Sequence, residues 1–221
     1  MKEKYLFASL LILICSLALI PACLPASTPA TPNASPVTET FSAVDTDIVK
    51  ILLKPMGEVD AAIVDGLKSN LEQTFGCPVE TVYEDYDLEY AYVPDRNQYL
   101  VDPIFSDLTE YSPPEGEKVL GIVDVDIYAP GLNFLFSQSE ISGGTSLVSL
   151  ARLGRQYFFL PADKALLLDR ATKEAVHGLG HTLGLEDCFN AKCVMHYSNN
   201  VADTDKKEAA FCHWCLAKLE K

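Results

Sequence analysis

The sequence predicts an α/β fold, because strand-like and helix-like segments alternate along the chain after residue 46. Residues 47–55 and 77–83 are apolar runs rich in β-branched side chains, as is typical of strands. Residues 59–75, between them, carry apolar side chains at helical intervals. A strand, a helix and a strand in this order predict two parallel strands joined by a helix that packs on the sheet.

The remaining elements follow in order. Gly76 is expected to end the first helix. Further strands are predicted at residues 118–128, 133–136, 146–153 and 155–160, and a short helix at residues 104–108. Asp163 fits the N-cap of a helix of about 20 residues that ends at Leu183. A last helix is predicted to open at residues 203–208, where Asp205 and Glu208 have capping-box spacing.

Length and charge limit the classes of protein to consider. The chain has 221 residues, of which 48% are apolar, so one folded domain is expected, at residues 46–221. Acidic residues outnumber basic ones by 31 to 17, which gives a net charge of −14. A nucleic-acid surface would need clustered lysine and arginine, so no nucleic-acid partner is expected. We expect a monomer with a solvated acidic surface.

The N-terminus predicts export. Positive charge in residues 1–4 precedes an apolar run of 16 residues at 5–20, which is typical of a secretory signal. A membrane-spanning helix needs roughly 20 residues. The sequence Ile-Pro-Ala-Cys that ends at Cys23 resembles a bacterial lipobox, so we expect Cys23 to carry a lipid outside the cytoplasm. Simple cleavage or an uncleaved anchor are the alternatives. Residues 24–45, rich in Pro, Ala, Ser and Thr, are predicted to form a tether.

Residues 177–187 read His-Gly-Leu-Gly-His-Thr-Leu-Gly-Leu-Glu-Asp and predict a metal site. His177 and His181, four residues apart, lie on one face of a helix, close enough to share a metal ion. Gly184 allows the chain to leave the helix, so that Asp187 can return as a third ligand. Imidazole and carboxylate groups both bind zinc. The alternative is two ordinary helix histidines and a solvent-exposed turn acid.

This arrangement is similar to the H-E-x-x-H-x-x-G-x-x-H layout of the metzincin zinc peptidases, with two differences. Gly178 stands at the position of the glutamate, and Asp187 stands at that of the third histidine. In such helices the glutamate takes the proton of a water whose pKa zinc lowers to about 7. Glycine cannot do this. We expect no structural benefit from Gly178, because glycine inside a helix costs about 0.5–1 kcal/mol relative to alanine.

The loss of an acid–base group predicts impaired peptide hydrolysis. A positioned group of this kind contributes about 10²–10⁴-fold to the rate. Glu174 lies one turn before His177, but a residue on that side projects away from the open zinc position. The sequence therefore names no secure catalytic residue. Asp187, Glu186 or a group of the substrate remain as alternative bases.

The cysteines predict a second zinc site. Two close pairs, separated by 18 residues, fit a structural zinc held by four thiolates at about 2.3 Å. The pairs are Cys188 with Cys193 and Cys212 with Cys215. Disulfides are the alternative in an exported chain, but ligands three apart on a helix favour a metal. Of the others, Cys15 lies in the signal, and Cys77 is predicted to be a buried thiol. His196 and His213 are interpreted as surface or packing residues.

Together these motifs resemble the archaemetzincin signature, carried here by His177, His181, Gly184, Asp187, Cys188, Cys193, Met195, Cys212 and Cys215. The resemblance covers about residues 48–221. It implies a metzincin-like domain with a mixed twisted sheet, an active-site helix, a methionine turn at Met195 and a C-terminal helix that carries the cysteine site. It also implies two zinc ions and an edge strand near residues 133–136 that can hold an extended peptide or protein ligand.

The combined interpretation is an archaemetzincin-like zinc metallopeptidase whose catalysis is impaired by Gly178. One alternative is a working peptidase with another base. The other is a non-catalytic, zinc-containing module on the same fold that binds peptides or senses the cell surface. The working peptidase differs from the first interpretation in its turnover, which restoring a glutamate at residue 178 would not raise. The binding module predicts peptide affinity without turnover, and this affinity would not depend on His177.

Overall fold

The structure is a computed structural model that describes residue 44 and residues 46–220. The predicted signal peptide, with Cys15 and Cys23, and nearly all of the predicted tether lie outside the described residues. None of the described helices combines the length and the apolar composition needed to span a bilayer.

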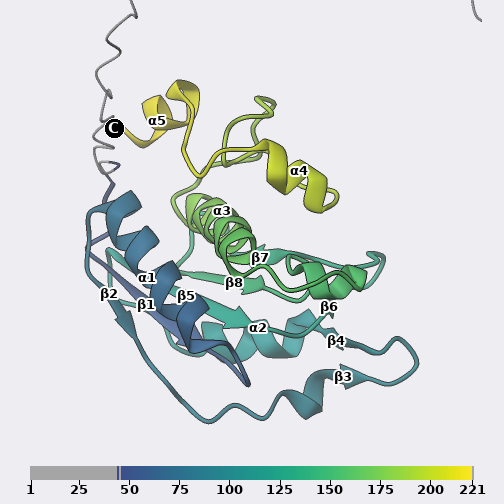
Figure 1. Ribbon diagram of the computed structural model, residues 1–221. Coiled ribbons are helices and arrows are strands. Elements are labelled where there is room, and N and C mark those ends of the chain that lie inside the picture. Colours follow the sequence, from purple (N-terminus) through teal and green to yellow (C-terminus); the bar gives the residue numbers. More distant parts are fainter. Residues whose placement is uncertain (1–43, 45, 221) are drawn as a thin grey trace, which may run out of the picture. The chain divides into compact units, whose positions relative to one another are not determined.

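A five-stranded mixed sheet forms the centre of the domain (Figure 1). Four of its strands are parallel and follow the order β2, β1, β5, β8, while β7 pairs antiparallel with β8 at one edge. The predicted mixed sheet and the parallel pairing of the first two strands are therefore confirmed. The strands are β1 (Lys50–Pro55), β2 (Val79–Thr81), β5 (Glu117–Val123), β7 (Ser137–Ser139) and β8 (Thr145–Ser149).

Helices cover both faces of this sheet (Figure 1). On one face, α1 (Ala61–Phe75) and α3 (Lys164–Thr182) pack on the core that contains Ile51 and Leu53. On the other, α2 (Val101–Thr109) packs on the core that contains Leu52. Alternate side chains of a strand point to opposite faces, which explains this division of β1. As predicted, Gly76 ends α1, with a left-handed φ of 65°.

The predicted strand at residues 118–128 is wrong as a single element. It is divided into β5 and β6 (Ile127–Tyr128), and β6 joins a separate small sheet with β3 (Tyr92–Val93) and β4 (Gln98–Leu100). Side-chain contacts hold the break between them. Asp126 accepts hydrogen bonds from Arg152 and Gln98, and the Val125 carbonyl accepts one from Ser149 Oγ at 2.6 Å.

Two further strand predictions are wrong. Residues 133–136 are irregular, and the edge strand β7 begins at Ser137, four residues after the predicted start. The shift arises because Leu135 donates its N–H to Ile127, in the small sheet, before the chain reaches β8. Residues 155–160, predicted as a strand, contain the 3-10 helix η2 (Arg155–Phe158). A second 3-10 helix, η1, spans Leu88–Ala91.

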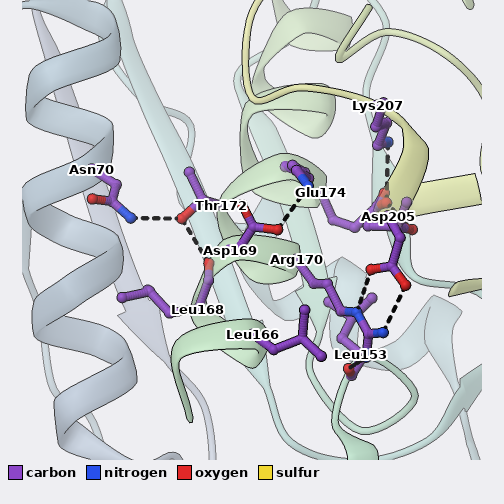
Figure 2. A network of polar contacts seen from close by, with 12 residues as sticks. Asn70, Leu153, Leu166, Leu168, Asp169, Arg170, Thr172, Glu174, Asp205 and Lys207 are labelled. Carbon is purple, nitrogen blue, oxygen red and sulfur yellow. Dashed lines mark hydrogen bonds and ion pairs between the residues drawn. The ribbon is translucent and has the colours of Figure 1, made fainter. Parts of the chain in front are cut away.

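The C-terminal segment also differs from the prediction of one helix. It forms α4 (Val201–Lys206) and a separate α5 (His213–Leu219), for which Cys212 is the N-cap residue. Lys207 ends α4 because its side chain turns inward to Glu174, 3.1 Å away. Asp205 makes a two-point contact with Arg170 and takes no part in a capping box (Figure 2).

Candidate metal centres

Helix α3 brings the two histidines together. It begins as predicted at Asp163, whose carboxylate accepts the N–H of Leu166 at 3.0 Å. After the helix, Gly184 adopts a φ of 87°, a left-handed conformation that favours glycine, and the chain turns back. Asp187 thereby returns to the histidines: its Oδ1 lies 3.7 Å from Nε2 of both His177 and His181.

The hydrogen bonds of the imidazoles direct their Nε2 atoms to a common point. His177 Nδ1 lies 3.0 Å from the Val194 carbonyl, and His181 Nδ1 lies 2.8 Å from the Leu185 carbonyl. A carbonyl only accepts, so each Nδ1 carries the proton and each Nε2 is left with a lone pair. The two Nε2 atoms are 3.1 Å apart. Burial first, and then the charge of Lys207, lower the pKa of His177 well below its usual value, which keeps the ring neutral.

This donor set fits a zinc ion. Two Nε2 lone pairs and a carboxylate oxygen, all hydrogen-bond acceptors, converge within 4.8 Å of one another without a donor between them. A cation satisfies all three at once. Nitrogen atoms about 2.0–2.1 Å from a tetrahedral zinc would lie about 3.3 Å apart, close to the separation of the two Nε2 atoms.

Gly178 allows α3 to approach β8 closely, contrary to the expectation that it brings no structural benefit. A Cβ atom at this position would lie 2.2 Å from Ser146 Oγ and 3.1 Å from Ser139 Oγ. The two hydroxyls are hydrogen-bonded to each other at 2.9 Å, and Ser146 is fully buried. Ser146 therefore fills the space in which a side chain at residue 178 would begin.

Met195 lies beneath the helix that carries the histidines. It is fully buried, and its Sδ would lie 2.3 Å from a Cβ atom at Gly180, so the glycine permits this packing. The Met195 carbonyl accepts the N–H of Cys188 at 2.8 Å. The segment that follows Asp187 is thus held against α3, at the place where the resemblance implies a methionine turn.

The four cysteines form a second candidate centre. Their Sγ atoms lie within 4.8 Å of one another, with Cys188 to Cys212 at 3.8 Å and Cys193 to Cys215 at 3.7 Å. Thiolates about 2.3 Å from a tetrahedral zinc are separated by about 3.8 Å, whereas disulfide sulfurs lie about 2.05 Å apart. Burial raises the pKa of Cys212, but backbone N–H groups and the neighbouring thiols outweigh it and lower this pKa to about 7. The arrangement fits a structural zinc.

The side chains of the other predicted residues belong to neither donor set. Cys77 is buried in the main core, as predicted. His196 contacts the Cys188 carbonyl through Nδ1 at 2.8 Å, and His213 packs on the Trp214 ring.

A buried polar network connects α3 with the end of α4 (Figure 2). The sequence analysis considered Glu174 but did not predict its partner Lys207. Glu174 Oε1 accepts hydrogen bonds from Ser198 at 3.2 Å and Thr204 at 2.7 Å, and it lies 3.1 Å from Lys207 Nζ. Lys207 is 1% exposed and also donates to the His196 carbonyl. No sequence spacing predicts the pairing of Glu174 with Lys207, since the two residues lie 33 positions apart.

A cavity of about 200 Å³, which we call the His177 cavity, opens beside the first candidate centre. The segment before β7, helix α3 and the residues after Met195 all contribute to its lining. Its lining includes Phe134, Phe136, Glu174, His177, Ser198 and Asn199.

Comparisons with known proteins agree with this fold. Residues 78–221 match the model of Peptidase family M54. The chain is 40% identical over 173 residues to the archaemetzincin of Methanocaldococcus jannaschii, covering 78% of this chain and 94% of the relative. It is 39% identical over 180 residues to that of Pyrococcus furiosus, covering 77% and 92%.

Solved structures show the same fold. The crystal structure of the archaemetzincin from Methanopyrus kandleri matches with a TM-score of 0.68 at 33% identity, covering 79% of this chain and 94% of that one. The archaemetzincin from Archaeoglobus fulgidus matches with a TM-score of 0.65 at 36% identity, covering 76% and 99%. The chain therefore belongs to Peptidase family M54, the archaemetzincin family of zinc metallopeptidases.

Proposed function

We propose that this archaemetzincin binds zinc at both candidate centres and binds peptides beside the first, but hydrolyses them poorly. The observation that carries the proposal is the contact between Gly178 and Ser146. At the place where the family pattern has its acid–base side chain, Ser146 Oγ lies 2.2 Å from the position of the absent Cβ. The site can therefore hold a metal ion but lacks the proton acceptor that peptide hydrolysis requires.

The nearby carboxylates are poor substitutes. Zinc at the first centre would supply a Lewis acid and lower the pKa of a water to about 7. Asp187 is needed as a ligand, since both Nε2 atoms face its Oδ1. Oε1 of Glu174 is engaged by Lys207, Ser198 and Thr204, and the Glu186 side chain is exposed. A base supplied by the substrate would leave only slow turnover.

Peptide binding is supported by the edge of the sheet. β7 pairs with β8 on one side only among the described strands, and it lies next to α3. An extended peptide can add to such an edge through main-chain hydrogen bonds. We expect the purified protein to bind short peptides with turnover far below the 1–10³ s⁻¹ typical of enzymes. Turnover in that range would contradict the proposal.

Counting zinc ions by elemental analysis tests the metal centres. Two ions per folded chain are expected after gentle removal of loosely bound metal, and His181→Ala should retain one. The first centre should lose its ion because the His181 imidazole supplies one of its three converging donor atoms. One ion in the unmodified protein would mean that only the cysteine centre is loaded. Peptide binding that is unchanged by His177→Ala would then favour a non-catalytic module on this fold.

We also propose that the protein is attached to the membrane outside the cytoplasm through a lipid on Cys23. The support is the apolar run at residues 5–20 and the lipobox-like sequence that ends at Cys23. In a bacterial host, a clickable fatty acid should label the full chain and place it in the membrane fraction. Cys23→Ala should abolish the label, with Cys77→Ala as the matched control. Label retained in the Cys23 variant would contradict lipidation.

A further inference from the structure

The geometry points to Glu174 as a specificity-determining residue: it selects peptides that place a lysine or arginine side chain in the His177 cavity. This inference rests on the proposed peptide binding and adds the chemical class of the ligand.

The carboxylate of Glu174 has one engaged oxygen and one free oxygen. Lys207, Thr204 and Ser198 all contact Oε1. Among the described residues, Glu117 Oε2 is the one fully buried side-chain oxygen or nitrogen that lacks a hydrogen-bond partner. Glu174 Oε2 receives none of these contacts and is not fully enclosed, although the Glu174 side chain is only 3% exposed. The His177 cavity, which Glu174 lines, is the space available to this oxygen.

The charge of Lys207 does not cancel this acceptor. Lys207 Nζ is itself fully buried and bound to Oε1 and to the His196 carbonyl. Hydrogen bonds to a charged group are stronger than neutral ones, so a cationic donor is favoured.

The size and walls of the cavity select the shape of the ligand group. A volume of about 200 Å³ is smaller than the 300–1,000 Å³ of typical small-molecule pockets and suits one side chain. Phe134 and Phe136, with ring centroids 5.1 Å apart in an edge-to-face pair, line the approach. A methylene stem packs against such rings while its charged tip reaches a polar group. Lysine and arginine have both parts.

Peptide binding to the zinc-loaded full chain tests the inference. The probes are end-blocked alanine-based peptides with lysine, methionine or glutamate placed at each position in turn, measured by fluorescence polarisation. At the best position, the lysine peptide should bind about tenfold or more tightly than the methionine peptide. Equal binding of all three would overturn the role of Glu174 but leave peptide binding intact, whereas no binding by any peptide would overturn the proposed function itself.

A double variant assigns the preference to Glu174. Glu174→Gln with Lys207→Met removes both charges and leaves no buried charge unpaired. The lysine-to-methionine preference should fall to within about twofold. The matched control, Asp169→Asn with Lys173→Met, removes the 2.7 Å ion pair on the same helix outside the cavity and should keep the preference (Figure 2). A preference retained in the first variant would overturn the assignment. If that variant does not fold, the peptide series on the unmodified chain still decides.

Discussion

The double variant Gly178→Glu with Ser146→Ala is expected to raise kcat/KM for peptide hydrolysis about 10²–10⁴-fold over the unmodified protein. The glutamate restores a proton acceptor beside His177. Ser146→Ala removes the hydroxyl that would lie 2.2 Å from the new Cβ and leaves Ser146 Cβ at 3.4 Å, an ordinary contact. A fluorogenic peptide library measures the change.

Gly178→Glu alone should gain less and lower the melting temperature by several degrees. Ser146 Oγ would have to rotate away from Ser139, and a buried hydroxyl without a partner costs about 1–3 kcal/mol. Gly178→Gln with Ser146→Ala is the matched control, because it fills the same space without a base. An equal gain from the glutamine variant would show that packing, and not proton transfer, limits the rate. No gain in a protein that is already active would refute impaired catalysis.

The sequence predicted α3 and its histidine face because the relevant information is local. An N-cap aspartate, a four-residue spacing and a glycine at the turn determine where His177, His181 and Asp187 lie, and each acts within a few residues. The four clustered cysteines were predictable for the same reason, since their spacing alone suits a tetrahedral site.

Contacts between distant segments were not predictable. Ser146, in strand β8, fills the space beside Gly178 in helix α3, and the sequence around either residue does not predict this contact. Lys207 ends α4 because Glu174 attracts it into the core, so a helix-initiation pattern at residues 203–208 gave a wrong boundary. The break at Asp126 depends on Arg152 in the same way. Tertiary partners override local propensity at each of these places.

Replacing Cys215 by serine is expected to destabilise the domain severely and to empty both metal centres. Cys193 and Cys215 are buried, and structural zinc sites contribute about 10–16 kcal/mol of apparent binding free energy in zinc-finger peptides. Domains of this kind are stable by only about 5–15 kcal/mol in total. Thermal unfolding and a zinc count measure the effect, and we expect the melting temperature to fall by about 10 °C or more.

The two centres are coupled through the chain between them. Val194, which follows Cys193, supplies the carbonyl that orients His177, and Met195 packs under α3 at Gly180. Loosening of the cysteine centre therefore frees the imidazole that the first centre needs. Cys77→Ala, at a buried cysteine outside the cluster, is the matched control and should keep both ions. If Cys215→Ser kept its melting temperature and lost a single ion, the cysteine centre would be a peripheral site, and the histidine centre would be stable without it.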